Sequence, residues 1–151
     1  MPLQVRLGHA GAVRTGEQLD RLHAKCTPQD LEDWLDEAER LVDLLERSRA
    51  DAEVVLTAYL DTAMRWQGPI RLANLDLAVR HAPGVGPRVE QLQHRWRRLV
   101  SHDDVAASAT LGVLTRPIVQ LGDGRVVQER SALVEAATMV LAALDPGHAT
   151  D

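Results

Sequence analysis

Aromatic residues and cysteine are scarce in this chain. It contains no phenylalanine, one tyrosine and three tryptophans, so its core must be built mainly from Leu, Val and Ala side chains. Its single cysteine, Cys26, excludes a disulfide within the chain. No apolar run approaches the ~18 residues of a membrane span, and the N-terminus lacks the basic and then apolar pattern of a signal peptide. These absences predict a soluble, cytoplasmic protein with no membrane segment.

Helical periodicity is the main feature that the sequence does contain. Its 151 residues are 45% hydrophobic and 26% charged, which is the ordinary composition of one globular domain. Apolar residues recur at helical spacing through most of the chain, so we expect an all-α protein. The expected architecture is a five- or six-helix bundle around a long helix at 28–66, with at most one small β-hairpin near 118–127. The domain should span 1–145, and 146–151 should form a disordered tail.

Capping and turn signals divide the rest of the chain into shorter elements. Pro117 is expected to end the helix before it, because proline lacks the N–H that a helix interior uses. Gly122-Asp123-Gly124 favours the turn of the small hairpin. The expected elements outside the long helix are a strand at 3–7 and helices at about 16–25, 70–81, 87–100, 103–115 and 128–144.

Residues 28–66 carry the clearest helical pattern, introduced by Thr27 as a good N-cap. An unbroken helix of this length would be ~58 Å long, whereas a compact domain of this size is roughly 40 Å across. The helix therefore either breaks at 48–51, where the capping rule allows a restart, or protrudes and forms a homodimer. In the second case the interface would be the apolar stripe at heptad spacing. That stripe consists of Leu31, Trp34, Leu41, Leu45, Val55 and Tyr59.

Charge is unevenly distributed along the chain. The net charge is −5, yet residues 70–102 hold six Arg against two acidic residues, between two acidic segments. Within the long helix, Asp36–Arg40 and Asp43–Arg47 are expected to form i,i+4 ion pairs. The sequence leaves two interpretations of the basic block open. It is either a face that binds a polyanion, or the electrostatic complement of the acidic long helix, within the chain or across a dimer.

Residues 79–92 carry the most specific local pattern. A helix with apolar residues leads into Pro-Gly-Val-Gly at 83–86, and an arginine follows at the start of the next helix. This pattern resembles a helix-hairpin-helix motif, which implies contact with the nucleic-acid backbone. By that resemblance, the glycine N–H groups would face a phosphate and the arginine would add charge. The site residues so implied, with the basic side chains of the next turns, are Gly84, Gly86, Arg88, Arg95 and Arg98.

Two weaker patterns suggest enzyme chemistry. Arg97 and His102 have an Arg-x4-His spacing, which resembles that of the HEPN ribonucleases. The resemblance implies a catalytic pair of Arg97, or its neighbour Arg98, with His102. Cys26 lies at a helix N-terminus, where the pKa of a thiol can be lowered. Neither pattern has a full set of catalytic partners, and a capped helix end and a small buried thiol explain them more simply. No repeated pair of ligand motifs indicates a metal site. We therefore expect no catalytic residue, metal or cofactor.

The sequence favours a non-enzymatic helical binding protein. The candidate target is the backbone of DNA or RNA, bound through the glycine hairpin and the arginine cluster. A protein–protein adaptor, inhibitor or assembly subunit that dimerises through the long helix is the first alternative, and a HEPN-like ribonuclease is the second. Salt dependence separates the leading two classes, because backbone binding weakens steeply with salt whereas an apolar helix interface does not.

Overall fold

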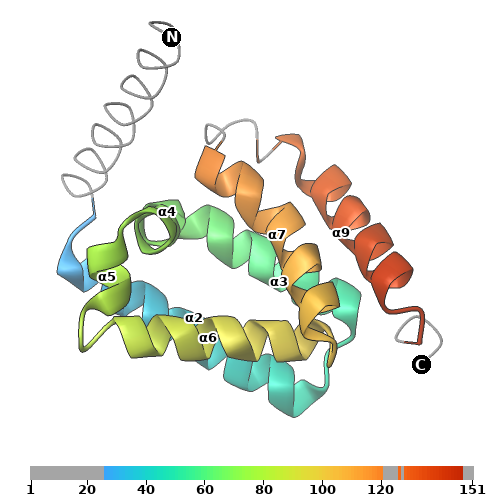
Figure 1. Ribbon diagram of the computed structural model, residues 1–151, viewed down its shortest axis with the longest axis horizontal. Coiled ribbons are helices and arrows are strands. Elements are labelled where there is room, and N and C mark those ends of the chain that lie inside the picture. Colours follow the sequence, from blue (N-terminus) through green and yellow to red (C-terminus); the bar gives the residue numbers. More distant parts are fainter. Residues whose placement is uncertain (1–25, 121–125, 127, 148–151) are drawn as a thin grey trace, which may run out of the picture.

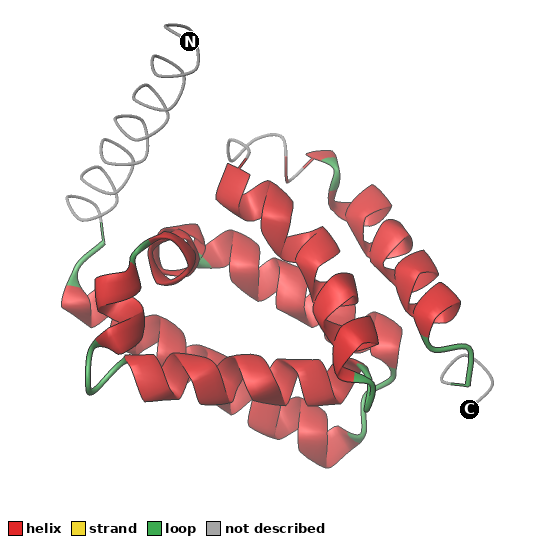
Figure 2. Ribbon diagram, viewed as in Figure 1, coloured by secondary structure: helices red, strands yellow, loops and turns green. Residues whose placement is uncertain are grey.

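The computed structural model describes residues 26–120, 126 and 128–147, and every regular element within these ranges is a helix (Figure 2). The predicted all-α fold is therefore confirmed. The strand expected at 3–7, the helix expected at 16–25 and the end of the expected tail lie outside the described residues. The described helices are α2 (Pro28–Ser48), α3 (Ala52–Arg65), α4 (Gln67–Leu75), α5 (Leu77–His81), α6 (Gly86–Val100), α7 (Asp104–Gln120) and α9 (Arg130–Leu144).

The helix expected at 28–66 is two helices, α2 and α3. Thr27 begins α2 as predicted, since its hydroxyl accepts the Asp30 N–H at 3.1 Å while the Asp30 carboxylate accepts the Thr27 N–H at 2.8 Å. The helix ends at Arg49, which adopts a left-handed conformation with φ 52°. Asp51 then caps α3 by accepting the Val54 N–H at 3.0 Å. This break removes the length mismatch that suggested a protruding helix.

The apolar stripe of the two helices faces the chain's own core. Four of its residues, Leu31, Trp34, Leu45 and Val55, are buried, and Leu41 and Tyr59 pack against the same core while half-buried. The core that contains them is built from side chains of α2, α3, α4, α5, α6, α7 and α9. The stripe is thus occupied by intrachain packing, and it does not present the exposed face that a dimer through these residues needs.

Two predictions of helix boundaries in the middle of the chain are wrong. The helix expected at 70–81 is divided into α4 and α5 at Asp76, whose backbone is extended and whose carboxylate accepts the Ala78 N–H at 2.9 Å. Pro117 does not end α7, which continues to Gln120. The carbonyl of Ile118 accepts a hydrogen bond of 2.7 Å from the Arg71 guanidinium, and the Ile118 side chain is fully buried. These contacts hold the last turn of α7 despite the proline.

The prediction of a small hairpin near 118–127 is wrong for residues 118–120, because they belong to α7. Residues 121–125 and 127 lie outside the described residues. The helix expected at 87–100 agrees with α6 to within one residue, and the helix expected at 128–144 begins two residues later, as α9. At the other end of α9, Pro146 and Gly147 lie in a turn at the start of the expected tail.

The helices surround one continuous core, with α9 on an outer side (Figure 1). α9 packs its inner face against α7 and α3, while α2 lies along α6 on the opposite side of the molecule. α6 also contacts α3 and α7, so these three helices form the centre of the fold. Among the described helices, none is long and apolar enough to cross a membrane.

Candidate functional site

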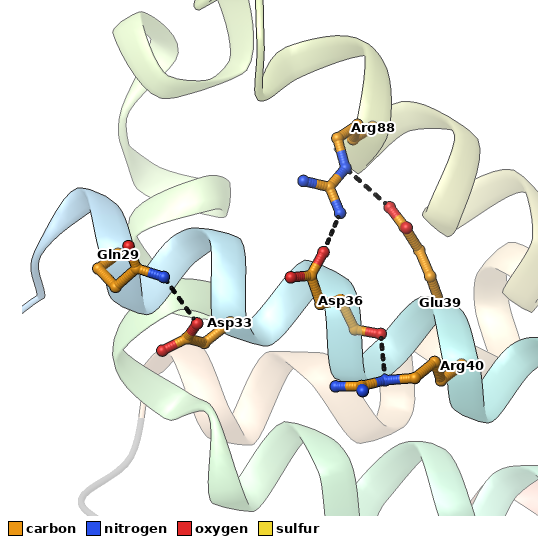
Figure 3. A network of polar contacts seen from close by, with 6 residues as sticks. All are labelled: Gln29, Asp33, Asp36, Glu39, Arg40 and Arg88. Carbon is orange, nitrogen blue, oxygen red and sulfur yellow. Dashed lines mark hydrogen bonds and ion pairs between the residues drawn. The ribbon is translucent and has the colours of Figure 1, made fainter.

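Ion pairs join the basic helix α6 to the acidic helix α2. The guanidinium of Arg88 lies between two α2 carboxylates, 2.9 Å from Glu39 through Nε and 2.8 Å from Asp36 through Nη2 (Figure 3). Two turns further along, Arg95 Nε lies 3.0 Å from Glu46, and its Nη2 also contacts Asp43. Hydrogen bonds to these carboxylates raise the pKa of both arginines. Two of the five predicted phosphate-binding residues are therefore already paired with carboxylates within the chain.

The pairing follows from matched spacing along the two helices. Arg88 and Arg95 are seven residues apart, and so are the two acidic pairs of α2, at 36 and 43 and at 39 and 46. Seven residues are about two helical turns, so each set lies along one stripe of its helix. The expected i,i+4 pair of Asp36 with Arg40 is replaced, since the Arg40 Nε donates instead to the backbone carbonyl of Asp36 at 3.2 Å (Figure 3). The spacing was present in the sequence and would have indicated this interface.

The glycine hairpin between α5 and α6 is held by its own backbone. The Gly86 N–H, which the resemblance assigns to a phosphate, donates to the Ala82 carbonyl at 2.8 Å. A Cβ on Gly86 would lie 2.1 Å from the Arg80 carbonyl oxygen, so glycine is required there by the close approach of α5 and α6. Gly84 is exposed, and a Cβ there would meet nothing within 4 Å. The two glycines therefore have different structural roles.

The structure places the residues of the two enzyme-like patterns as follows. Arg98 and His102 are exposed, Arg97 is half-buried, and His102 lies in the turn that follows α6. The Cys26 thiol is buried, and burial raises its pKa, with a further contribution from the nearby Asp30 carboxylate. A raised pKa disfavours the thiolate that a nucleophile needs. The structure thus supports the simpler interpretation of Cys26 as a small buried side chain.

A cleft that the sequence did not predict opens between α4, α6 and α7, beside α3. Trp96 and Tyr59 meet there edge to face, with ring centroids 5.0 Å apart and an interplanar angle of 83°. Tyr59 also shares a hydrogen bond of 2.6 Å with Thr115. The cleft has a volume of about 240 Å³ and is lined by Tyr59, Asn74, Gln93, Trp96, Arg97, Ser108, Leu111, Gly112 and Thr115. The one sequence signal for it is Gly112, a glycine in the interior of a helix.

The outward side of α9 is the second surface that the sequence did not single out. Although α9 has the apolar composition of a core helix, only Ala137 and Leu141 of its side chains are buried. Met139 is 67% exposed and Leu144 is 46% exposed. Between 131 and 144 the only charged side chain is Glu135. A solvent-facing helix normally carries many more charges, so this face is unusual for a surface that meets water.

Neither a metal centre nor a known relative identifies the site. In the described part of the chain, no group of three or more His, Cys, Asp or Glu side chains is placed to hold a metal ion. Comparison of the chain with protein-family models, with curated proteins and with solved structures finds no match. The functional proposal therefore depends on the geometry of the exposed face of α9.

Replacing both paired arginines by methionine should lower stability. The Arg88→Met/Arg95→Met protein keeps most of the apolar stem of each side chain but leaves four α2 carboxylates without their cations. Since both arginines are about one-third exposed, we expect a loss of about 1–2 kcal/mol in the free energy of unfolding, measured with urea. High salt should reduce the difference. Arg98→Met, at an exposed position with no carboxylate partner among the described residues, is the matched control and should be neutral. Equal stability of the double variant and the control would contradict the structural role of the pairs.

Proposed function

We propose that the protein is a non-enzymatic assembly subunit that forms a homodimer through the outer face of α9. The observation that carries this proposal is the exposure of an almost uncharged helix on the outside of the molecule (Figure 1). Burial of apolar surface is the main driving force of most protein association. A second copy that covers α9 would remove Met139 and its alanine neighbours from water.

The spacing of residues along the outer side of α9 suits a second helix. Ala132, Met139 and Ala143 are exposed and Ala136 is half-buried. These four residues follow one another at intervals of four, three and four residues, which is the spacing of a coiled-coil seam. Alanine side chains allow two helix backbones to approach closely. In an antiparallel pair of α9 helices centred between Ala136 and Met139, the large Met139 of one copy would lie opposite the small Ala136 of the other. The seam is therefore complementary to itself, as a two-fold interface requires.

Charge supports a second copy as the occupant of this face. A heterologous partner is normally selected by charges around an apolar centre. The face of α9 offers only Glu135, and the antiparallel arrangement places that side chain opposite Val140 rather than opposite its own copy. Like charges of the two subunits are thus kept apart, although the chain as a whole is acidic.

Binding to the nucleic-acid backbone is less well supported by the geometry. Arg88 and Arg95 are paired with carboxylates, and the Gly86 N–H is used within the hairpin. Gly84 and Arg98 are the members of the predicted site that lie exposed. A single turn and one arginine supply few of the phosphate contacts on which such binding depends. The geometry therefore supports association through the face of α9 better than nucleic-acid binding through the hairpin.

Introducing a charge at the centre of the face should abolish the dimer. Light scattering after size-exclusion chromatography should give the wild-type protein about twice the 16.6 kDa mass of the chain, and this mass should persist as salt rises. Met139→Glu should be monomeric with unchanged helical content, since the position is 67% exposed. Leu77→Glu, on α5 and 68% exposed, is the matched control and should remain dimeric. A monomeric wild type, or a dimeric Met139→Glu protein, would refute the proposal.

A further inference from the structure

Gly112 has no structural reason to be glycine. It lies in the interior of α7, where a glycine costs about 1 kcal/mol relative to alanine. Its φ is not positive, so no left-handed conformation requires it. A Cβ built on Gly112 would meet nothing within 4 Å, so no close approach requires it either. Gly112 is exposed and lines two hollows on the surface of the molecule, so the absence of a side chain leaves the space between them open.

The open space is the junction of two hollows along α7. One is the cleft beside Trp96, and the other is a groove of about 800 Å³ between α4 and α7. Asn74, Gly112 and Thr115 line both, so the two hollows lie next to each other. They differ in chemistry. The cleft has the polar side chains of Gln93, Arg97 and Ser108. The groove also has two exposed polar side chains, Arg116 and Gln120, which are hydrogen-bonded to each other at 3.3 Å. The rest of its own lining is apolar and consists of Leu75, Ala109, Val113, Pro117 and Val119.

Arg97 is the charged side chain that lines the cleft beside Trp96, which is the polar end of the proposed site. Among the residues that the structure describes, no carboxylate pairs with it, in contrast to Arg88 and Arg95 on the same helix. Thr115 donates its single hydroxyl hydrogen to the Leu111 carbonyl at 2.9 Å, so the Tyr59 hydroxyl is the donor in the bond between them. Burial raises the pKa of Tyr59, which keeps the phenol neutral. A half-buried cation without an internal partner is suited to an anionic ligand.

We propose that this cleft binds an amphipathic carboxylate of the medium-chain fatty acid class. The carboxylate would pair with Arg97, beside Gln93, and the alkyl tail would lie in the groove between α4 and α7. From Gly112 to Val119 the helix rises by roughly 10 Å, which accommodates the tail of a molecule such as decanoate. The polar end supplies the orientation and the apolar end supplies buried area, which is the usual arrangement in small-molecule sites. This site is separate from the face of α9 and does not depend on dimerisation.

Titration of the full-length protein with decanoate, followed by calorimetry and by amide shifts in NMR spectra, tests the proposal. Gly112→Leu should fill the junction and abolish binding, and its melting temperature should not fall, because leucine is a better helix former than glycine. Arg97→Gln should weaken binding on the order of tenfold, as expected when a charge-assisted contact is lost. The uncharged analogue decanol should bind to the wild type more weakly by a similar factor.

Two controls separate the cleft from other surfaces. Arg98→Gln removes the neighbouring charge, which does not line the cleft, and should leave decanoate affinity unchanged. Met139→Glu should also leave it unchanged, so that failure of the dimer proposal and failure of this one are distinguishable. Absence of decanoate binding to the wild type would overturn the proposal. It would equally be overturned if Gly112→Leu or Arg97→Gln bound decanoate as well as the wild type, or if decanol bound as tightly as decanoate.

Discussion

Gly86→Ala should destabilise the protein by at least ~3 kcal/mol, whereas Gly84→Ala should have almost no effect. The added Cβ at Gly86 would lie 2.1 Å from the carbonyl oxygen of Arg80 and 2.9 Å from its carbonyl carbon. These are backbone atoms, so no side-chain rotation relieves the clash, and α5 and α6 must move apart. Gly86 itself is buried, and Val89, one turn later, is buried at the same junction.

Gly84 is the matched control for this prediction, because it is in the same turn and receives the same added methyl group. Space around it is open, and its φ is not positive. Urea denaturation of the two variants, followed by circular dichroism, measures the difference. If the glycines were present chiefly to admit a phosphate, both variants would fold normally and differ from the wild type only in nucleic-acid binding. Equal stability of the two variants would therefore contradict a packing role for Gly86.

Leu45→Ala should cost about 2–5 kcal/mol of unfolding free energy, and Leu44→Ala should cost little. The two leucines are neighbours on α2 and undergo the same chemical change. Leu45 is 5% exposed and belongs to the core, whereas Leu44 is 57% exposed. Truncation of Leu45 removes buried methyl groups and leaves a cavity, but truncation of Leu44 removes groups that already meet water.

The comparison of these two leucines tests whether the heptad stripe of α2 and α3 is core or interface. If the stripe joined two subunits, Leu45→Ala would make the stability strongly dependent on protein concentration. If it is core, the loss should be the same at low and high concentration. Thermal unfolding of both variants across a range of concentrations separates the cases, and a loss that disappears on dilution would contradict the fold described above.

The sequence predicted correctly those features of the fold that depend on neighbouring residues, such as the start of a helix. Thr27 and Pro28 begin α2 as expected, because the capping box needs only residues within one turn. The restart at Asp51 was visible as an alternative, but sequence could not choose it, since the length of a helix depends on what covers it. Pro117 was misjudged for a similar reason. Its local effect is outweighed by the burial of Ile118 and by the hydrogen bond from Arg71 on another helix.

The candidate sites were harder to predict than the helices. Six arginines between 70 and 102 indicate a basic surface, but which of them are neutralised depends on the alignment of α6 with α2. The cleft is formed by residues from four helices. Among them only Gly112, a glycine in the interior of a helix, is unusual in the sequence. The exposure of the α9 face could not be predicted from the sequence, because apolar residues in a helical pattern are normally assigned to the core. Only packing shows that α9 buries so few of its side chains.

A dilution series of amide NMR spectra tests the central claim, that the outer face of α9 joins two copies of the chain. We expect amide shifts that change with concentration at Ala132, Ala136, Met139 and Ala143, while those of buried α2 positions such as Leu35 and Val42 stay constant. Met139→Glu should show the dilute spectrum at every concentration. Shifts that do not depend on concentration, or that depend on it along α2 rather than α9, would contradict the proposed dimer.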